Sequence, residues 1–277
     1  MKWTKYQSLG NDFLVAELAV YEKVYGARDS IPWHDWVQPV VSLCNRNLGF
    51  GADGVILYRQ TGFNDFDCLL INCDGSAAGF SGNGFACLAK HCITSGEGTI
   101  NHRYDVSSSS RSVKVVIKDF QSISDKYLFT RTLRGQGYSL WDVGNEHAVF
   151  VKKVGSFPPR FFEDPFEDFD DLSELSLETH FDALERYPDS INIGIALVCE
   201  DKLQLKVRER GCGWTEACSS GAVAAFLAVR AAGLQYNEVN IMQVGGSANL
   251  RWHEGLQSVD LTLDPQFIGS LEYEYKR

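Results

Sequence analysis

The sequence predicts an α+β protein of two pseudo-symmetric halves, and three observations point to this class. Strand patterns with alternating apolar residues occur along the whole chain, together with a few helical patterns. A glycine-rich turn that opens a helix occurs twice, around Ser81 and around Cys218. A chain of 277 residues can also bury two cores of ordinary size. We therefore expect an N-terminal half over residues 1–119, a C-terminal half over 120–264, and a tail, 265–277, that completes the first sheet.

The turn around Cys218 carries the chemistry. Strand Leu203–Val207 leads into glycines, and a helix of small residues then begins at Cys218 and stops at Gly233, a favourable helix end. Free N–H groups at a helix N-terminus bind anions and favour a thiolate. We therefore expect a lowered pKa for Cys218, which should alkylate first among the eight cysteines. A reactive sulfur beside a carboxylate cradle can take a proton from the α-carbon of an amino acid.

An earlier stretch repeats this layout. The aligned pairs are Ser81 with Cys218, Gly84 with Gly221, Gly96 with Gly233, and Gly10-Asn11 with Gly144-Asn145. Echoes in the same order and at similar spacing indicate an internal duplication.

The first half begins with a predicted hairpin of strands 2–7 and 13–20, whose tip is Gly10-Asn11-Asp12, followed by a polar linker. Helical spacing of apolar residues predicts a helix over 33–47. The Ser-rich segment 107–112 is expected to be a loop at a sheet edge. Further strands are predicted over 55–58, 66–72 and 113–117.

The second half contains most of the remaining predicted strands. They are expected around 127–133 and 148–154 and over 189–198, 203–207, 239–244, 246–252 and 258–263. The acidic and aromatic segment 157–177 is interpreted as a solvated connection with a short helix.

Composition limits the partners. A net charge of −10 disfavours binding to nucleic acid, which needs clustered Lys and Arg. No apolar run is long enough to span a membrane, and the N-terminus lacks the apolar core of a signal peptide. Cysteines in apolar patterns are typical of reduced, buried thiols, and their spacing does not favour a metal site. We expect a cytoplasmic protein without a bound metal.

Eight short motifs, in order, carry a resemblance to a known family. They are Leu9-Gly-Asn-Asp-Phe13, Gly49-x-Gly-Ala-Asp-Gly54, Asn72-x-Asp-Gly-Ser76, Gly82-Asn-Gly84, Gly144-Asn-x-His147, Asn192, Glu209-Arg-Gly211 and Thr215-x-Ala-Cys218. With them the chain resembles diaminopimelate epimerases, which are pyridoxal-independent amino-acid epimerases. The resemblance covers almost the whole length. It implies two similar halves, each a curled β-sheet around a central α-helix, with the active site in the cleft between them.

The resemblance also implies a mechanism without a cofactor. One cysteine acts as thiolate base and another as thiol acid on opposite faces of the α-carbon, which converts LL- to meso-diaminopimelate for lysine and peptidoglycan precursors. Cys218 is one of the pair, with Glu209 and His147 beside the cysteines. The residues implied to hold the substrate carboxylate are Gly82, Asn83, Ser219 and Ser220, and those implied at its distal amino-acid end are Asn11, Asn72, Asn145, Asn192 and Arg210, with Glu209 also in contact. Taken without the family, each asparagine is interpreted as a turn residue and Arg210 as part of a surface ion pair.

Ser81 stands where the family pattern has its other cysteine. A hydroxyl is far less acidic than a thiol, so Ser81 is a poor acid–base partner for Cys218. Three explanations are open: a deliberate substitution that traps a state, a natural variant with weak or altered activity such as one-base exchange or elimination, and an inactive relative kept for binding.

Smaller departures from the family pattern leave the substrate open. They are Ala77, Ala86, Glu146, Trp214 and Val244. The alternatives are a racemase, epimerase or one-base lyase for another amino acid, or a catalytically silent amino-acid-binding protein. The expected partner is a small amino-acid substrate, diaminopimelate first, and we also consider a homodimer.

Overall fold

The computed structural model describes residues 1–62, 65–78, 81–95, 103–108, 111–116, 131–132, 138–143, 145–156, 191–210, 213–234, 236–254 and 258–273. The chain divides into two compact units, one of residues 1–122 with 263–277 and the other of residues 123–262. The segment 157–177 and most of the strand predicted over 127–133 lie outside the described residues.

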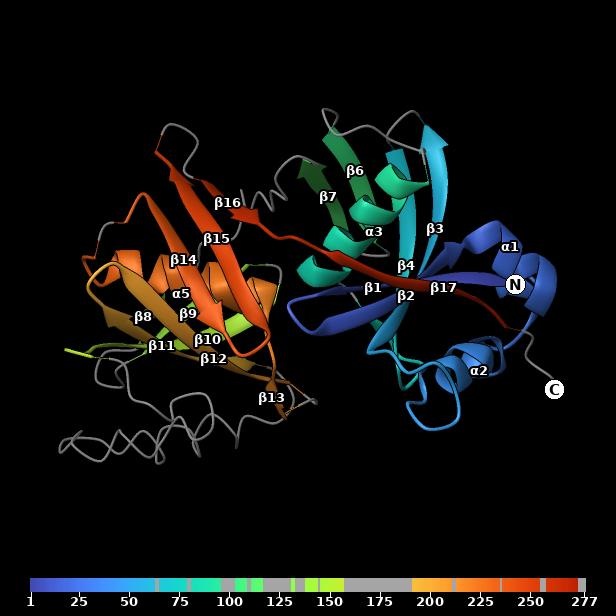
Figure 1. The fold of residues 1–277 in the computed structure, drawn as a ribbon, viewed down its shortest axis with the longest axis horizontal. Coiled ribbons are helices and arrows are strands. Elements are labelled where there is room, and N and C mark those ends of the chain that lie inside the picture. The colour runs from blue at the N-terminus through green and yellow to red at the C-terminus, as the bar shows by residue number, and fades with distance from the viewer. Residues whose placement is uncertain are drawn as a thin grey trace. The chain divides into compact units, whose positions relative to one another are not determined.

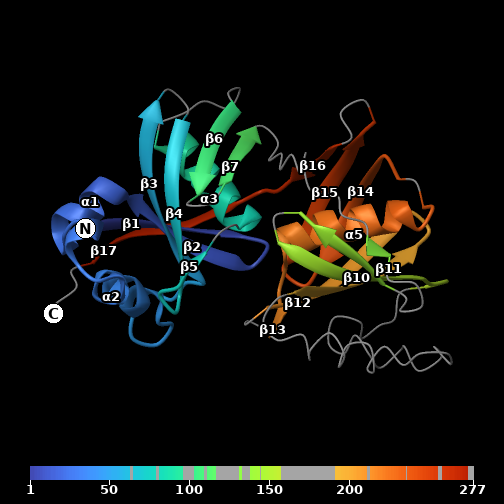
Figure 2. The same cartoon turned by 180° about the vertical axis from the view of Figure 1, so that it is seen from behind.

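The first unit is built on a mixed sheet (Figures 1 and 2). Its strands are β1 (Lys2–Ser8), β2 (Asn11–Glu17), β3 (Gly54–Gly62), β4 (Asp65–Asn72), β5 (Ala77–Ala78), β6 (Arg103–Ser108), β7 (Arg111–Val116) and β17 (Gln266–Glu272). The order is β17-β1-β2-β3-β4-β6-β7, with β5 paired to β4. The C-terminal strand β17 pairs antiparallel with β1, Thr4 opposite Ser270, so the tail returns to the first sheet. The Ser-rich segment lies at the β7 edge of the sheet, as predicted, but its described residues are paired strand residues, with Ser107 opposite Ser112 and Ser108 opposite Arg111.

Helices pack on both faces of this sheet. Helix α1 (Leu18–Tyr25) is joined to helix α2 (Trp33–Cys44) by the 3₁₀ turn η1 (Arg28–Ser30). Both helices pack against one face of the sheet, in a hydrophobic cluster that includes Trp3, Val55 and Trp36. Strand residues alternate between faces, so Ile56 points the other way. There it lies near the first turn of helix α3 (Gly82–Thr94).

Two predictions about the first hairpin were wrong. Residues 18–25 form helix α1 instead of a strand end and a polar linker, because Tyr21 and Tyr25, one helical turn apart, are both buried. The hairpin tip is Leu9-Gly10, not Gly10-Asn11-Asp12. Ser8 pairs directly with Asn11, and the two residues between them have φ of 54° and 85°, as a two-residue hairpin turn requires.

The second unit holds another mixed sheet around a central helix, α5 (Ser219–Ala231). Its strands are β8 (Arg131–Thr132), β9 (Tyr138–Asp142), β10 (Glu146–Lys153), β11 (Asn192–Cys199), β12 (Lys202–Glu209), β13 (Gly213–Thr215), β14 (Glu238–Gln243), β15 (Gly246–His253) and β16 (Ser258–Thr262). Strand β9 was not predicted. Helix α5 is buried along almost its whole length, which its run of small and apolar residues permits.

The two units repeat the same pairings. Strands β1 to β4 pair as antiparallel, parallel and antiparallel neighbours, and β9 to β12 do the same. A short strand precedes each central helix: β5 pairs with β4, and β13 pairs with β12. The strand after the helix runs parallel to the same partner, β6 to β4 and β14 to β12. The predicted duplication is therefore confirmed.

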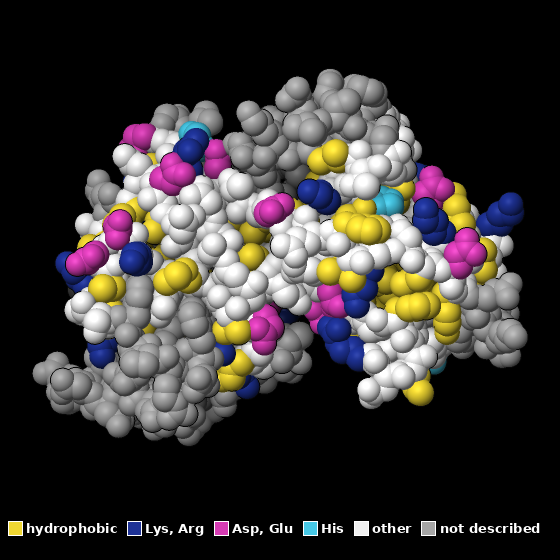
Figure 3. All heavy atoms as spheres, viewed as in Figure 1, with side chains coloured by type: hydrophobic (Ala, Val, Ile, Leu, Met, Phe, Trp, Pro, Cys, Tyr) yellow, Lys and Arg dark blue, Asp and Glu magenta, His cyan; other side chains and the backbone are white. Residues whose placement is uncertain are grey.

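The described surface agrees with the charge pattern of the sequence. On the face shown in Figure 3, Lys and Arg side chains are interspersed with Asp and Glu. In the part of the chain that the structure describes, no helix is long and apolar enough to cross a membrane.

Candidate active site

Helices α3 and α5 begin with the same capping geometry. Ser81 caps α3 with φ −148° and ψ 111°, and its Oγ accepts the N–H of Gly84 at 3.1 Å. Cys218 caps α5 with φ −132° and ψ 115°, and its Sγ accepts the N–H of Gly221 at 3.4 Å. Both helices are 13 residues long. The predicted correspondence of Ser81 with Cys218 is confirmed in geometry.

Each helix start retains two amides that can bind an anion. The first N–H groups of an α-helix have no intrahelical acceptor, and here the capping side chain takes only the third. The remaining two belong to Gly82 and Asn83 in α3 and to Ser219 and Ser220 in α5. The positive end of the helix dipole lies at the same point. That these helix starts bind a carboxylate stays a prediction.

Gly221 is required by a close approach. A Cβ at this position would lie 2.9 Å from Cγ2 of Val207 and 3.4 Å from Sγ of Cys218. Any side chain would push the helix start away from strand β12 or displace the thiol.

The prediction of a lowered pKa for Cys218 was wrong. Only 5% of Cys218 is exposed, and burial raises the pKa of its thiol; the nearby carboxylate of Glu209 raises it further. Hydrogen bonds from Ser220 and from the N–H of Gly221 act in the opposite direction but are weaker causes. Desolvation of the thiolate therefore outweighs these two hydrogen bonds. Among the described cysteines Cys73 is the exposed one, so Cys218 is no longer expected to alkylate first.

His147 lies behind the Cys218 turn. Its Nε2 is 3.0 Å from Oγ of Ser220, which in turn lies 3.4 Å from Sγ of Cys218 and accepts from Nδ2 of Asn145 at 3.4 Å. Complete burial lowers the pKa of His147 to about 3, so its imidazole is neutral near pH 7. The second unit thus brings a thiol, a hydroxyl and a neutral imidazole into one chain of contacts.

Asn192, Arg210 and Glu209 adjoin this chain. Nδ2 of Asn192 lies 3.5 Å from Nε2 of His147, and its Oδ1 accepts the backbone N–H of Arg210 at 2.9 Å. Oε1 of Glu209 accepts from the hydroxyl of Thr215 at 2.9 Å. All the site residues predicted in the second half therefore lie around the start of α5.

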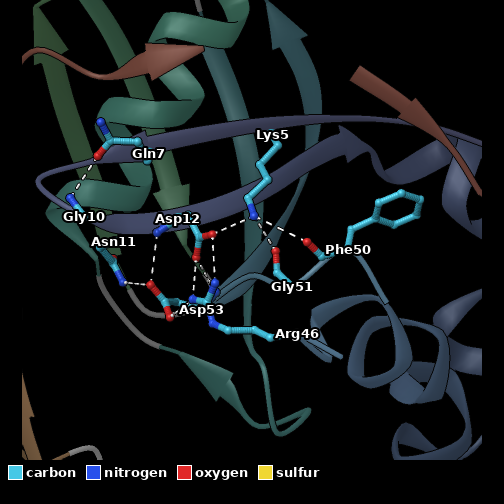
Figure 4. A network of polar contacts seen from close by, with 9 residues as sticks. All are labelled: Lys5, Gln7, Gly10, Asn11, Asp12, Arg46, Phe50, Gly51 and Asp53. Carbon is cyan, nitrogen blue, oxygen red and sulfur yellow. Dashed lines mark hydrogen bonds and ion pairs between the residues drawn. The ribbon is translucent and has the colours of Figure 1, made fainter. Parts of the chain in front are cut away.

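In the first unit a charged network holds Asn11 (Figure 4). Nδ2 of Asn11 donates to Oδ2 of Asp53 at 2.7 Å, and Arg46 binds the other oxygen of Asp53, also at 2.7 Å. Arg46 also forks onto both oxygens of Asp12, at 3.2 and 2.8 Å, and Nζ of Lys5 lies 2.7 Å from Oδ2 of Asp12. Burial alone raises the pKa of Asp12, but the hydrogen bonds from Arg46 and Lys5 bring it below its usual value. Sequence reasoning missed Arg46 and Lys5.

Asn72 and Asn83 complete the set in this unit. Asn72 ends β4 directly opposite Gly54, the first residue of β3, and its Nδ2 donates to Oγ of Ser76 at 2.9 Å. Asn83 is buried, and its Oδ1 accepts from Oγ of Ser8 at 3.5 Å. The expectation that the sites of the two units share one cleft stays a prediction.

No protein-family model matches the chain. It is 30% identical over 281 residues to a diaminopimelate epimerase of Synechococcus sp. (strain JA-3-3Ab), with 95% of this chain and 94% of the relative covered. It is 29% identical over 296 residues to a diaminopimelate epimerase of Legionella pneumophila (strain Corby), with 97% of each chain covered.

Solved structures with lower identity share the fold. A protein from Pseudomonas aeruginosa described as a predicted epimerase matches with a TM-score of 0.66 at 12% identity, covering 99% of each chain. A hydroxyproline epimerase from Agrobacterium vitis with bound trans-4-hydroxy-L-proline matches with a TM-score of 0.62 at 12% identity, covering 98% of this chain and 90% of the other. The chain has the diaminopimelate epimerase-like fold, and by sequence it belongs to the diaminopimelate epimerase family.

Proposed function

We propose that the chain acts on the α-carbon of diaminopimelate without a cofactor and converts the LL- to the meso-form slowly. The observation that carries this proposal is the repeated helix start, with Cys218 at one cap and Ser81 at the equivalent cap. Inversion requires a proton to leave one face of the carbon and to arrive at the other. In this proposal Cys218 serves one face and Ser81 the other.

The two caps are unequal acids and bases. A serine hydroxyl needs a neighbouring base to act, and among the described residues no side-chain base contacts Oγ of Ser81, which accepts from Gly84. A missing acid or base reduces the rate by about 10² to 10⁴. We therefore expect exchange of the α-proton through Cys218 to be faster than inversion.

The carboxylate of the substrate would bind the free amides at the helix starts. These belong to Gly82, Asn83, Ser219 and Ser220. Charge that develops on the carboxylate as the proton leaves would be stabilised by the same donors and by the helix dipoles.

The polar residues around the helix starts would recognise the distal end. Nδ2 of Asn11 is committed to the acceptor-only carboxylate of Asp53, so its Oδ1 is left to accept from an ammonium group. The guanidinium of Arg210 suits a carboxylate through its planar fork. Asn72, Asn145, Asn192 and Glu209 would add contacts to the same end. A substrate with amino-acid groups at both ends satisfies both polarities.

Ser220 and His147 would position the thiol of Cys218. The Ser220 hydroxyl lies between Sγ of Cys218 and Nε2 of His147, and the lowered pKa of His147 suits this imidazole to hold the hydroxyl rather than to take up the proton of the thiol. We also propose that the protein acts in the cytoplasm, in the synthesis of lysine and peptidoglycan precursors, and that a homodimer is its assembly.

A second candidate is one-base chemistry or elimination on another amino acid, which Ser81 favours because it leaves a thiol at one of the two helix caps and a hydroxyl at the other. Incubation of diaminopimelate, lysine and glutamate with the chain in heavy water separates the candidates, with α-deuteration followed by mass spectrometry and configuration by chiral separation. The proposal is supported if diaminopimelate is deuterated and inverted while lysine and glutamate are not. Deuteration without inversion indicates one-base chemistry, and binding without deuteration indicates a silent binding protein.

A further inference from the structure

Gln243 ties a distant hairpin to the start of helix α5. It is the last residue of β14, it is 95% buried, and its Oε1 accepts the N–H of Cys218 at 2.8 Å. Two residues on, the N–H of Gly245 donates to the carbonyl of Glu216 at 2.8 Å. The turn between β14 and β15 therefore fixes the backbone of the segment that carries the thiol.

The other end of the Gln243 amide is unused. Its Nε2 is buried and has no hydrogen-bond partner among the described residues. The orientation of the amide is determined, because only the oxygen can accept from the N–H of Cys218. A buried donor without a partner is unfavourable, so a bound group with an acceptor atom would be stabilised there.

The position of this donor defines the group that would bind. Nε2 belongs to the same amide group as Oε1, which accepts the N–H of Cys218. The next two residues, Ser219 and Ser220, begin helix α5, and their backbone N–H groups have no intrahelical acceptors. Donors gathered at the positive end of a helix dipole favour an anion over a cation or a neutral amide. A carboxylate can accept from several N–H groups at once.

We propose that Nε2 of Gln243 is a further donor of the carboxylate subsite at the start of α5, and that it binds the α-carboxylate of the substrate beside Cys218. This rests on the proposed function for the identity of the substrate. The residue has a second effect through its Oε1, which positions Cys218. The binding of an anion at this subsite does not depend on which substrate the protein uses, because it requires only the N–H donors of Gln243, Ser219 and Ser220.

Alkylation of Cys218 by two reagents tests the subsite without requiring activity. Iodoacetate carries a carboxylate and iodoacetamide a neutral amide, so the ratio of their rate constants reports anion binding and cancels changes in thiolate population. Gln243→Met removes both functions of the amide. Gln243→Glu keeps an acceptor for the N–H of Cys218 but replaces the donor with a second acceptor. Gln204→Met, at a partly buried glutamine on β12, is the control.

The iodoacetate-to-iodoacetamide ratio at Cys218 should fall about tenfold or more in Gln243→Met, the loss expected for a hydrogen bond to a charged group, and at least as far in Gln243→Glu. It should not change in Gln204→Met. An unchanged ratio in Gln243→Met, or in Gln243→Glu if the methionine variant does not fold, overturns the subsite. Protection of Cys218 by diaminopimelate in the unaltered chain is a separate readout. Its absence, with the ratio still reduced in the variants, refutes the proposed substrate and leaves the anion subsite standing.

Discussion

The buried imidazole of His147 should make the protein sensitive to mild acid. Burial lowers the pKa of His147 to about 3, whereas in the unfolded chain it takes up a proton near pH 6.5. Its contribution to stability is therefore complete above pH 6.5 and is lost progressively as the pH falls toward 3. Between pH 7.5 and 5 the free energy of unfolding should decrease by about 2 kcal/mol because of this residue alone. His91, whose pKa burial lowers to about 4, should add a similar decrease in the first unit.

Urea unfolding at pH 7.5 and at pH 5 measures this effect. Trp141 is buried directly opposite His147 in the sheet, and the first unit also has tryptophans, at positions 3, 33 and 36, so tryptophan fluorescence follows the unfolding of both units. In His147→Asn the difference between the two pH values should shrink by about 2 kcal/mol, whatever the variant does to stability at pH 7.5. The exposed His34 provides the control, since His34→Asn should retain the full difference. An equal pH difference in His147→Asn and the unaltered chain would refute a neutral buried imidazole.

Two further predictions concern the helix starts. Gly221→Ala, whose Cβ would lie 2.9 Å from Cγ2 of Val207, should lower the free energy of unfolding by about 1–3 kcal/mol. Gly84→Ala, whose Cβ would meet nothing nearer than 3.3 Å, should lower it by less in the same urea experiment. Equal losses in the two variants would argue against the close approach at Gly221. Limiting iodoacetamide followed by mass mapping should label the exposed Cys73 before the buried Cys218, and the reverse order would show that the helix terminus outweighs burial.

Local patterns predicted much of the fold. The two glycine-rich turns and the helices after them follow from short-range signals, because turn residues and apolar spacing act within a few positions. Helix α1 was missed because its reason to form is tertiary. Tyr21 and Tyr25 become helical neighbours only when a cluster with Trp3 and Trp36 is present to bury them.

The site was predicted as a set of residues but not in its energetics. Motif positions correctly gathered Cys218, Ser220 and His147 around one helix start. The pKa of the thiol was predicted in the wrong direction because a helix terminus is visible in the sequence, whereas burial depends on strands far along the chain. Arg46 was overlooked for a similar reason: its role comes from reaching Asp12 across 34 residues.

The central claim is that the chain retains an epimerase site and lacks one proton carrier. Ser81→Cys tests it most directly, because Ser81 already accepts the N–H of Gly84 in the way that Cys218 accepts the N–H of Gly221. Chiral separation of diaminopimelate after incubation should show epimerisation at least about 100-fold faster than in the unaltered chain. Cys218→Ser in the same background should remove the gain. No increase in inversion, with binding of diaminopimelate still measurable, would contradict the claim.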